Sequence, residues 1–174
     1  MNELILGGAR SGKSALAERL ALASAMDVIY LATATAGDGE MSERIRQHQQ
    51  RRPSHWPLLE EPVELATTLQ THATENTTIL VDCLTLWLSN LLATESEPLF
   101  QQQRAALLQC LPSLPGRILL VSNEVGMGVV PMGELTRRFV DEAGRLHQDL
   151  AQICHRVTLV VAGIPQVLKG EPLE

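Results

Sequence analysis

Near its N-terminus the chain reads Gly7-Gly8-Ala9-Arg10-Ser11-Gly12-Lys13-Ser14, which completes the pattern G-x-x-x-x-G-K-[ST]. Strand-like residues 3–6 precede the pattern, and the alanine- and leucine-rich residues 15–26 that follow it favour a helix. A strand, this loop and a helix in that order form a phosphate-binding loop. The position of the pattern therefore predicts a P-loop and the binding of a nucleoside triphosphate.

The expected task of this loop is to surround phosphate oxygens with donors. Its backbone N–H groups point inward at an anion, and the N-terminus of the following helix adds about half a positive charge. Lys13 can reach the β- and γ-phosphates, and Ser14 can ligate Mg²⁺. A glycine-rich structural turn would explain Gly7 and Gly12, but it gives no reason for Lys13 and Ser14.

Four further runs are almost continuously apolar, as strands covered on both faces are: residues 28–31, 78–81, 118–121 and 157–161. Helical patterns lie between them, and the longest predicts a helix from about Gly133 to Cys154 with one apolar stripe. We expect one α/β domain over residues 1–174, a P-loop (RecA-like) doubly wound, mostly parallel sheet with helices on both faces. Two segments are expected to be surface loops, residues 94–98 and 112–116.

The composition narrows the class of protein. The net charge of −6 argues against a dedicated nucleic-acid surface. No apolar run approaches the roughly 20 residues that span a bilayer, so we expect a cytoplasmic protein without stable membrane insertion. Cys83, Cys110 and Cys154 are widely spaced and form no C-x-x-C pair, which predicts reduced and mostly buried thiols.

Asp82 comes directly after the apolar run 78–81, at the expected end of a buried strand. A carboxylate there can hold Mg²⁺ directly or through water, as the second half of a phosphate-loop site. Aspartate also caps helices well, and a helix over residues 83–93 would begin beside it. The metal role is favoured because the phosphate loop is present, although one residue can serve both roles.

Residues 40–56 combine a basic helical pattern with an unusual histidine. A helix that runs to about Arg51 places Ile45 and His48 on one face, with Arg44 one turn below His48. A neutral imidazole among guanidinium groups suits a nucleophile that attacks a phosphate. On these residues alone, a partly buried structural histidine is the simpler interpretation.

A glycine-punctuated segment, residues 123–131, follows the strand predicted over residues 118–122. Loops at the carboxyl ends of such strands commonly bind substrate. A structural turn would explain the glycines but not Asn123 and Glu124 at the start of the segment. The charged residues of the next helix are expected to lie on a solvated face; they are Arg137, Arg138, Asp141 and Arg145.

Together these residues resemble one family, the bifunctional adenosylcobinamide kinase/adenosylcobinamide-phosphate guanylyltransferase of cobalamin biosynthesis. The resemblance follows almost the whole chain in order. One matching stretch is residues 122–131, and its block Asn123-Glu124-Val125-Gly126-Met127-Gly128 is far more specific than the phosphate loop. Other matching positions are residues 7–14, 30–34, 40–41, 44–45, His48, 52–53, Trp56, Glu60, 80–85, Asp141, 144–145, Gln148 and 163–164.

The resemblance implies a role for each matching residue. The family histidine that becomes guanylylated corresponds to His48, which with Lys13 would be catalytic. Ser14 and Asp82 would hold Mg²⁺. The implied nucleotide contacts are Gly7, Gly8, Ala9, Arg10, Ser11, Gly12, Lys13, Ser14, Ala32, Thr33, Ala34, Gln49, Gln50, Arg51, Arg52, Glu60 and Asp82.

The resemblance also implies two activities and an assembly. The kinase phosphorylates the aminopropanol hydroxyl of adenosylcobinamide with ATP or GTP. The transferase then moves GMP from GTP, through the histidine, onto that phosphate to give adenosylcobinamide-GDP and pyrophosphate. The implied partners are the corrinoid and the nucleotides, and the family is a homotrimer. This chain departs from many relatives at His147, where they have Asn, and at Ala162, where serine is common.

Other functions compete with this interpretation. A monofunctional P-loop small-molecule kinase would need His48 only as a structural residue. A regulatory GTPase would need an Asn/Thr-Lys-x-Asp motif after a strand, which the sequence lacks. A motor that acts on DNA conflicts with the acidic charge.

Overall fold

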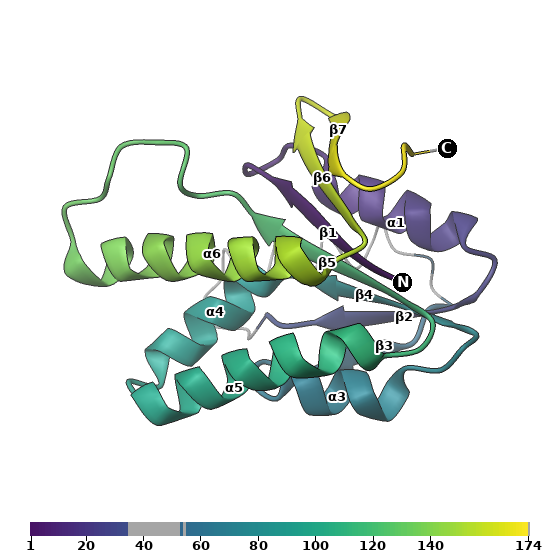
Figure 1. The fold of residues 1–174 in the computed structure, drawn as a ribbon, viewed down its shortest axis with the longest axis horizontal. Coiled ribbons are helices and arrows are strands. Elements are labelled where there is room, and N and C mark those ends of the chain that lie inside the picture. Colours follow the sequence, from purple (N-terminus) through teal and green to yellow (C-terminus); the bar gives the residue numbers. More distant parts are fainter. Residues whose placement is uncertain (35–52, 54, 174) are drawn as a thin grey trace.

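The computed structural model describes residues 1–34, 53 and 55–173, and a seven-stranded sheet forms its centre (Figure 1). The strands are β1 (Asn2–Gly7), β2 (Asp27–Ala32), β3 (Leu58–Glu60), β4 (Thr77–Asp82), β5 (Arg117–Asn123), β6 (Arg156–Val161) and β7 (Ile164–Lys169). Their order across the sheet is β3-β2-β4-β5-β1-β6-β7. All neighbouring pairs are parallel except β6 and β7, which form an antiparallel hairpin at one edge.

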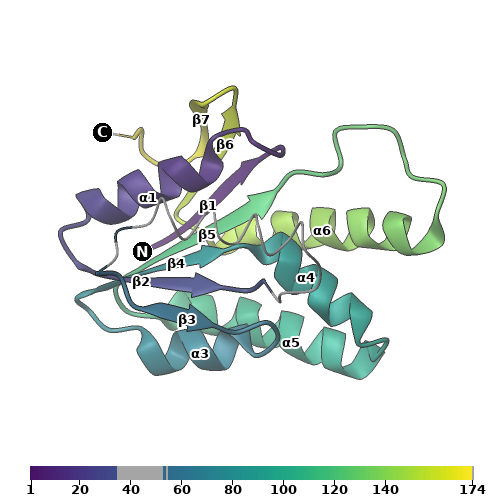
Figure 2. The ribbon, with the colours of Figure 1, turned by 180° about the vertical axis from the view of Figure 1, so that it is seen from behind.

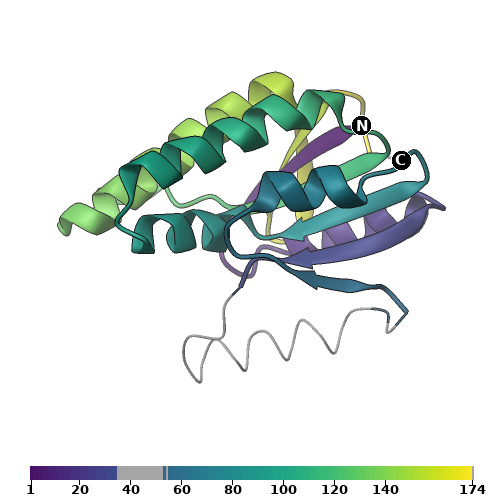
Figure 3. The ribbon, with the colours of Figure 1, turned by 90° about the horizontal axis from the view of Figure 1, so that it is seen from below.

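The described helices cover the two faces of the sheet unequally. They are α1 (Lys13–Ala23), α3 (Leu65–His72), α4 (Leu84–Ala93), α5 (Glu97–Cys110) and α6 (Glu134–Ile153), with a short 3₁₀ turn at Leu111–Ser113. Figure 3 shows α3, α4, α5 and α6 on one face and α1 on the other. The predicted doubly wound, mostly parallel α/β sheet is confirmed.

The side chains of each central strand divide between two cores. Leu4 and Leu6 of β1 pack in the core beneath α3–α6, whereas Ile5 packs in the core beneath α1. Ile79 and Leu80 of β4 divide in the same way. Because successive strand residues point to opposite faces, a strand buried on both sides must be apolar throughout.

Most predicted elements lie close to their expected positions. The helix expected over residues 15–26 begins at Lys13 and ends at Ala23, because Ala25 takes a left-handed conformation with φ 55°. The helix expected from about Gly133 to Cys154 is α6. Its stripe packs on the core through Ala143, Leu146 and Leu150, while Leu135 near its start is exposed.

One predicted loop is partly wrong, and two strands were not predicted. Residues 97–98 belong to α5 rather than to a loop, because Ser96 caps the helix and Pro98 stands in its first turn. The Oγ of Ser96 accepts from the N–H of Leu99 at 3.4 Å. The short β3 and the edge strand β7 carried too little apolar pattern to be recognised.

A long arch joins β5 to α6 and stands away from the rest of the molecule (Figures 1 and 2). It contains residues 124–133, the predicted substrate loop. Its side chains include exposed apolar groups, since Met127, Val129 and Met132 are 78%, 97% and 95% accessible. In the described part of the chain, the helices are too short or too polar to cross a bilayer.

Candidate active site

The predicted phosphate loop joins the end of β1 to the start of α1. Gly12 has a φ of 98°, which a side chain would strain, and α1 begins at the next residue. The N–H of Gly163, in the turn between β6 and β7, donates to the carbonyl of Ser11 at 2.8 Å. The hairpin therefore supports the loop from the side opposite to β5 (Figure 2).

Two side chains of the loop, those of Lys13 and Ser11, carry donor groups that suit an anion. Lys13 is buried, and its ammonium donates to the carbonyl of Gly8 at 3.1 Å. Burial lowers the pKa of Lys13, while the nearby Asp82 carboxylate opposes that shift. The Oγ of Ser11 is buried, and no group in the described part of the chain hydrogen-bonds to it. A buried hydroxyl without a partner is costly, so a phosphate oxygen would satisfy it.

Asp82 ends β4, and β5 separates it from the phosphate loop. The hydroxyl of Tyr30 donates to its Oδ2 at 2.9 Å. Asp82 does not cap the next helix: α4 begins at Leu84, and its N-cap position is Cys83, which makes no side-chain cap hydrogen bond in the described part of the chain. The helix-cap alternative is therefore wrong, and the Asp82 carboxylate instead accepts the hydroxyl of Tyr30 from the neighbouring strand β2.

Ser14 and Asp82 offer the oxygen ligands that Mg²⁺ prefers. The described residues hold no cluster of three or more His, Cys, Asp or Glu side chains that could bind a metal on its own. A magnesium ion in a phosphate loop commonly uses one or two protein oxygens together with phosphates and water. The hydroxyl and carboxylate present here fit that requirement.

Other predicted nucleotide residues lie at the same edge of the sheet. Ala32 pairs with Asp82 on one side and with Glu60 on the other. Thr33 is fully buried, and its hydroxyl donates to the carbonyl of Cys83 at 2.6 Å. Ala34 follows and is the last described residue before the range 35–52. The carboxyl ends of parallel strands thus bring these predicted contacts together.

The predicted nucleophile and its neighbours lie outside the described residues. They are His48, Gln49, Gln50, Arg51 and Arg52, together with the helix expected to run to about Arg51. Their proposed roles remain predictions.

The end of β5 contacts the first residue of the phosphate loop. Glu124 donates its backbone N–H to the carbonyl of Gly7 at 3.0 Å. Its Oε1 accepts the N–H of Gly126 at 2.5 Å, and its Oε2 lies 3.6 Å from Nδ1 of His147. Sequence reasoning placed Asn123 and Glu124 at the site but did not give His147 or Tyr30 a role, since their partners become visible only through strand register and helix packing.

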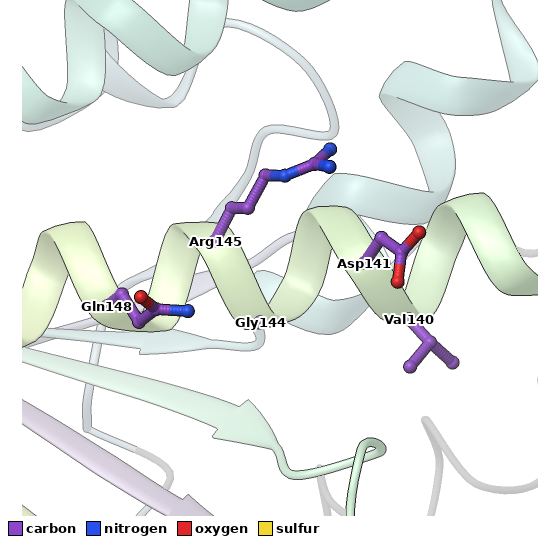
Figure 4. A pocket seen from close by; sticks show the side chains of 5 residues that line it. All are labelled: Val140, Asp141, Gly144, Arg145 and Gln148. Atoms are coloured by element: carbon purple, nitrogen blue, oxygen red, sulfur yellow. The ribbon is translucent and has the colours of Figure 1, made fainter. Parts of the chain in front are cut away.

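The exposed side of α6 carries an open hollow of about 330 Å³. Its lining residues are Val140, Asp141, Gly144, Arg145 and Gln148 (Figure 4). Asp141 and Arg145 are exposed, which confirms the predicted solvated charged face. Arg145 forms an ion pair with Glu142 at 2.5 Å.

Comparison with known proteins decides the family. The pattern of the family "Cobinamide kinase / cobinamide phosphate guanyltransferase" matches residues 3–168. The chain belongs to this family. A relative from Pseudomonas aeruginosa, "Bifunctional adenosylcobalamin biosynthesis protein CobP", is 62% identical over 173 residues, which are 99% of this chain and all of that protein. The Escherichia coli protein "Bifunctional adenosylcobalamin biosynthesis protein CobU" is 37% identical over 95% of this chain and 98% of its own length.

Solved structures at low identity support the fold of this cobinamide kinase family member. A Pyrococcus horikoshii protein, PH0250, superposes with a TM-score of 0.58 at 8% identity, over 98% of this chain and 87% of that one. The RadB recombinase superposes with a TM-score of 0.53 at 18% identity, over 91% and 73%. These likenesses confirm the RecA-like P-loop architecture.

Proposed function

We propose that this chain is a bifunctional enzyme that phosphorylates adenosylcobinamide and then transfers GMP to the product. The single observation that carries the proposal is a complete phosphate loop in a chain that matches the family from residue 3 to residue 168; the loop contains Lys13 and the hydroxyl of Ser11, to which no described residue hydrogen-bonds. ATP or GTP would serve the first step, and GTP the second.

In the kinase step, the loop amides and Lys13 would hold the triphosphate and neutralise charge that develops on the transferred group. Ser14 and Asp82 would hold Mg²⁺, which supplies further neutralisation of phosphate charge when it is bound. Tyr30 keeps the Asp82 carboxylate in one orientation by donating to it. The corrinoid hydroxyl forms a bond to the γ-phosphorus, the bond from that phosphorus to the bridging oxygen breaks, and the hydroxyl proton is released.

In the transferase step, we assign His48 as the nucleophile. Its imidazole would form a bond to the α-phosphorus of GTP while pyrophosphate leaves. An oxygen of adenosylcobinamide phosphate then attacks the same phosphorus, and the N–P bond breaks to regenerate the imidazole. The basic neighbours Arg51 and Arg52, with Gln49 and Gln50, would contact the nucleotide, as would Ala32, Thr33, Ala34 and Glu60. This assignment rests on the family resemblance.

We also propose that residues 1–174 form one domain that assembles as a homotrimer in the cytoplasm. Exposed apolar side chains support an assembly, because isolated soluble chains rarely expose large contiguous apolar patches. They include Met127, Val129 and Met132 on the arch, and Ile164 on β7 at 70% accessibility. Sedimentation equilibrium of the purified protein checks the proposal, and a monomer at micromolar concentration would contradict it.

Labelling with GTP tests the transferase. The protein is incubated with α-³²P-labelled GTP, denatured and assayed for acid-labile label. We expect label on the wild type and none on His48→Ala, whose kinase activity should persist. Label retained by His48→Ala would refute the nucleophile. No label on an active wild-type kinase would favour the monofunctional kinase instead.

A variant of the loop tests the shared nucleotide site. Lys13→Ala should depress both activities by about a hundredfold or more, because it removes the charge that faces the β- and γ-phosphates. An unchanged kinase rate would show that the phosphate loop does not serve that step.

A further inference from the structure

A polar chain in the interior links α6 to the end of β5. His147 is 7% accessible and Ser122 is 2% accessible, and the Nε2 of His147 lies 2.8 Å from the Oγ of Ser122. The same Oγ lies 3.3 Å from the Oγ1 of Thr85 in α4. Thr85 in turn accepts the backbone N–H of Asn123 at 2.7 Å. Three elements are thus joined at the strand end beside the phosphate loop.

The other imidazole nitrogen faces a carboxylate. Nδ1 of His147 lies 3.6 Å from Oε2 of Glu124, a distance longer than a hydrogen bond but short enough for a strong electrostatic preference. A lone pair on Nδ1 would repel the carboxylate, whereas an N–H there attracts it. The favourable neutral form therefore carries its proton on Nδ1.

This tautomer also satisfies the hydroxyls. With the proton on Nδ1, Nε2 accepts the hydroxyl proton of Ser122, and the Oγ of Ser122 is free to accept that of Thr85. Among the described residues, Glu124 is the charged group that faces the imidazole ring. The groups that β5 and α4 place on the other side, Ser122 and Thr85, are uncharged. Burial lowers the pKa of His147, and Glu124 opposes this shift only in part.

We propose that His147 is a positioning residue for the nucleotide site: as a neutral ring whose Nδ1–H faces the Glu124 carboxylate, it orients Glu124 by electrostatic attraction, and so holds the end of β5 against Gly7 of the phosphate loop. The mechanical link is the 3.0 Å hydrogen bond from the Glu124 N–H to the Gly7 carbonyl. The Oε1 of Glu124 also accepts the backbone N–H of Gly126, in the first turn of the arch. This inference rests on the proposed function, because it assigns a consequence to nucleotide turnover.

Two substitutions separate this role from simple packing. In His147→Asn the side-chain amide nitrogen occupies the place of Nδ1, so the donor that faces Glu124 is kept and the contact with Ser122 is lost. In His147→Gln the amide oxygen can reach the place of Nε2 and accept the hydroxyl proton of Ser122, so that contact and more of the volume are kept. Positioning through Glu124 predicts that Asn is the better replacement, whereas packing predicts that Gln is.

The kinase step is measured for these variants and for His147→Leu, with thermal unfolding as the control for folding. We expect His147→Asn to retain kcat/KM for the nucleotide within about threefold. His147→Gln and His147→Leu should lose about tenfold, the loss typical of one polar contact to a charged group. The proposal would be overturned if His147→Gln kept a higher kcat/KM than His147→Asn. It would also be overturned if the loss of kcat/KM in each variant simply followed its fall in Tm.

A spectroscopic readout does not depend on activity. Long-range ¹H–¹⁵N correlation of the histidine rings, assigned by the signals absent from His147→Asn, should show a neutral ring with its proton on Nδ1 at pH 8, and a midpoint of ring protonation below that of a free histidine. A neutral ring with its proton on Nε2, or a midpoint of protonation above that of a free histidine, would refute the proposal. If the wild type lacks both kinase and transferase activity, the proposed function fails. The observed tautomer still tests whether the Nδ1–H of His147 faces Glu124.

Discussion

Replacing Tyr30 by phenylalanine removes one hydroxyl from the site and leaves the shape of the side chain almost unchanged. That hydroxyl donates to Oδ2 of Asp82 at 2.9 Å from a side chain that is 6% accessible. Burial, and then the Asp82 charge, raise the pKa of Tyr30 far above its usual value, so the group stays a protonated donor at any working pH. The variant therefore deprives a carboxylate of a donor at the proposed magnesium position.

The size of the effect follows from this contact. A hydrogen bond to a charged group is worth about 1.5–3 kcal/mol, and Asp82 is only half-buried, so we take about 1.5 kcal/mol. For a chain of this length that corresponds to a fall in Tm of about 3–6 °C. If the same free energy is lost from the transition state, the kinase rate falls about tenfold.

The assay measures Tm and the kinase rate of Tyr30→Phe across a Mg²⁺ titration, with Ile118→Val as the matched control. Ile118 is fully buried at the start of β5, far along the strand from the site, and the substitution costs about 0.5–1.5 kcal/mol. We expect Tyr30→Phe to need more Mg²⁺ for half-maximal rate and Ile118→Val to keep the wild-type requirement. An unchanged Tm and an unchanged Mg²⁺ requirement in Tyr30→Phe would refute the reasoning.

Three further outcomes are expected. Gly7→Ala should lower nucleotide affinity at least tenfold in a binding titration. The added Cβ would lie 2.6 Å from the carbonyl oxygen of Val160 and would collide with Ser11, so the phosphate loop would have to shift. An unchanged affinity would contradict that close approach. The folded protein should resist thiol reagents at pH 8 until it is denatured, because burial raises the pKa of Cys83 to about 11 and that of Cys154 to about 12. Denaturant titrations should show the free energy of unfolding falling as pH rises from 9 towards 12, since the unfolded chain releases thiol protons that the folded chain retains; a constant value would show that these thiols ionise alike in both states.

Much of the fold was predictable because its signals are local. Continuous apolar runs identified β2, β4, β5 and β6, and the phosphate-loop pattern identified β1 and the start of α1. The three cysteines are free and buried, as expected. Local signals were misjudged at Ser96 and Pro98, which begin α5, because a cap and a turn use the same residue types. The edge strand β7 escaped notice because all six of its residues are at least partly solvent-exposed, so its sequence carries no continuous apolar run.

The sequence alone determined that a phosphate loop stands between a buried strand and a helix, because every residue that pattern needs is adjacent in the chain. Only the tertiary structure decided which distant groups meet there. Tyr30 reaches Asp82 because β2 and β4 pair in parallel register, and His147 reaches Glu124 because α6 packs over the end of β5. Register and helix packing are set by the sum of many weak apolar contacts, and no short stretch of sequence contains that sum.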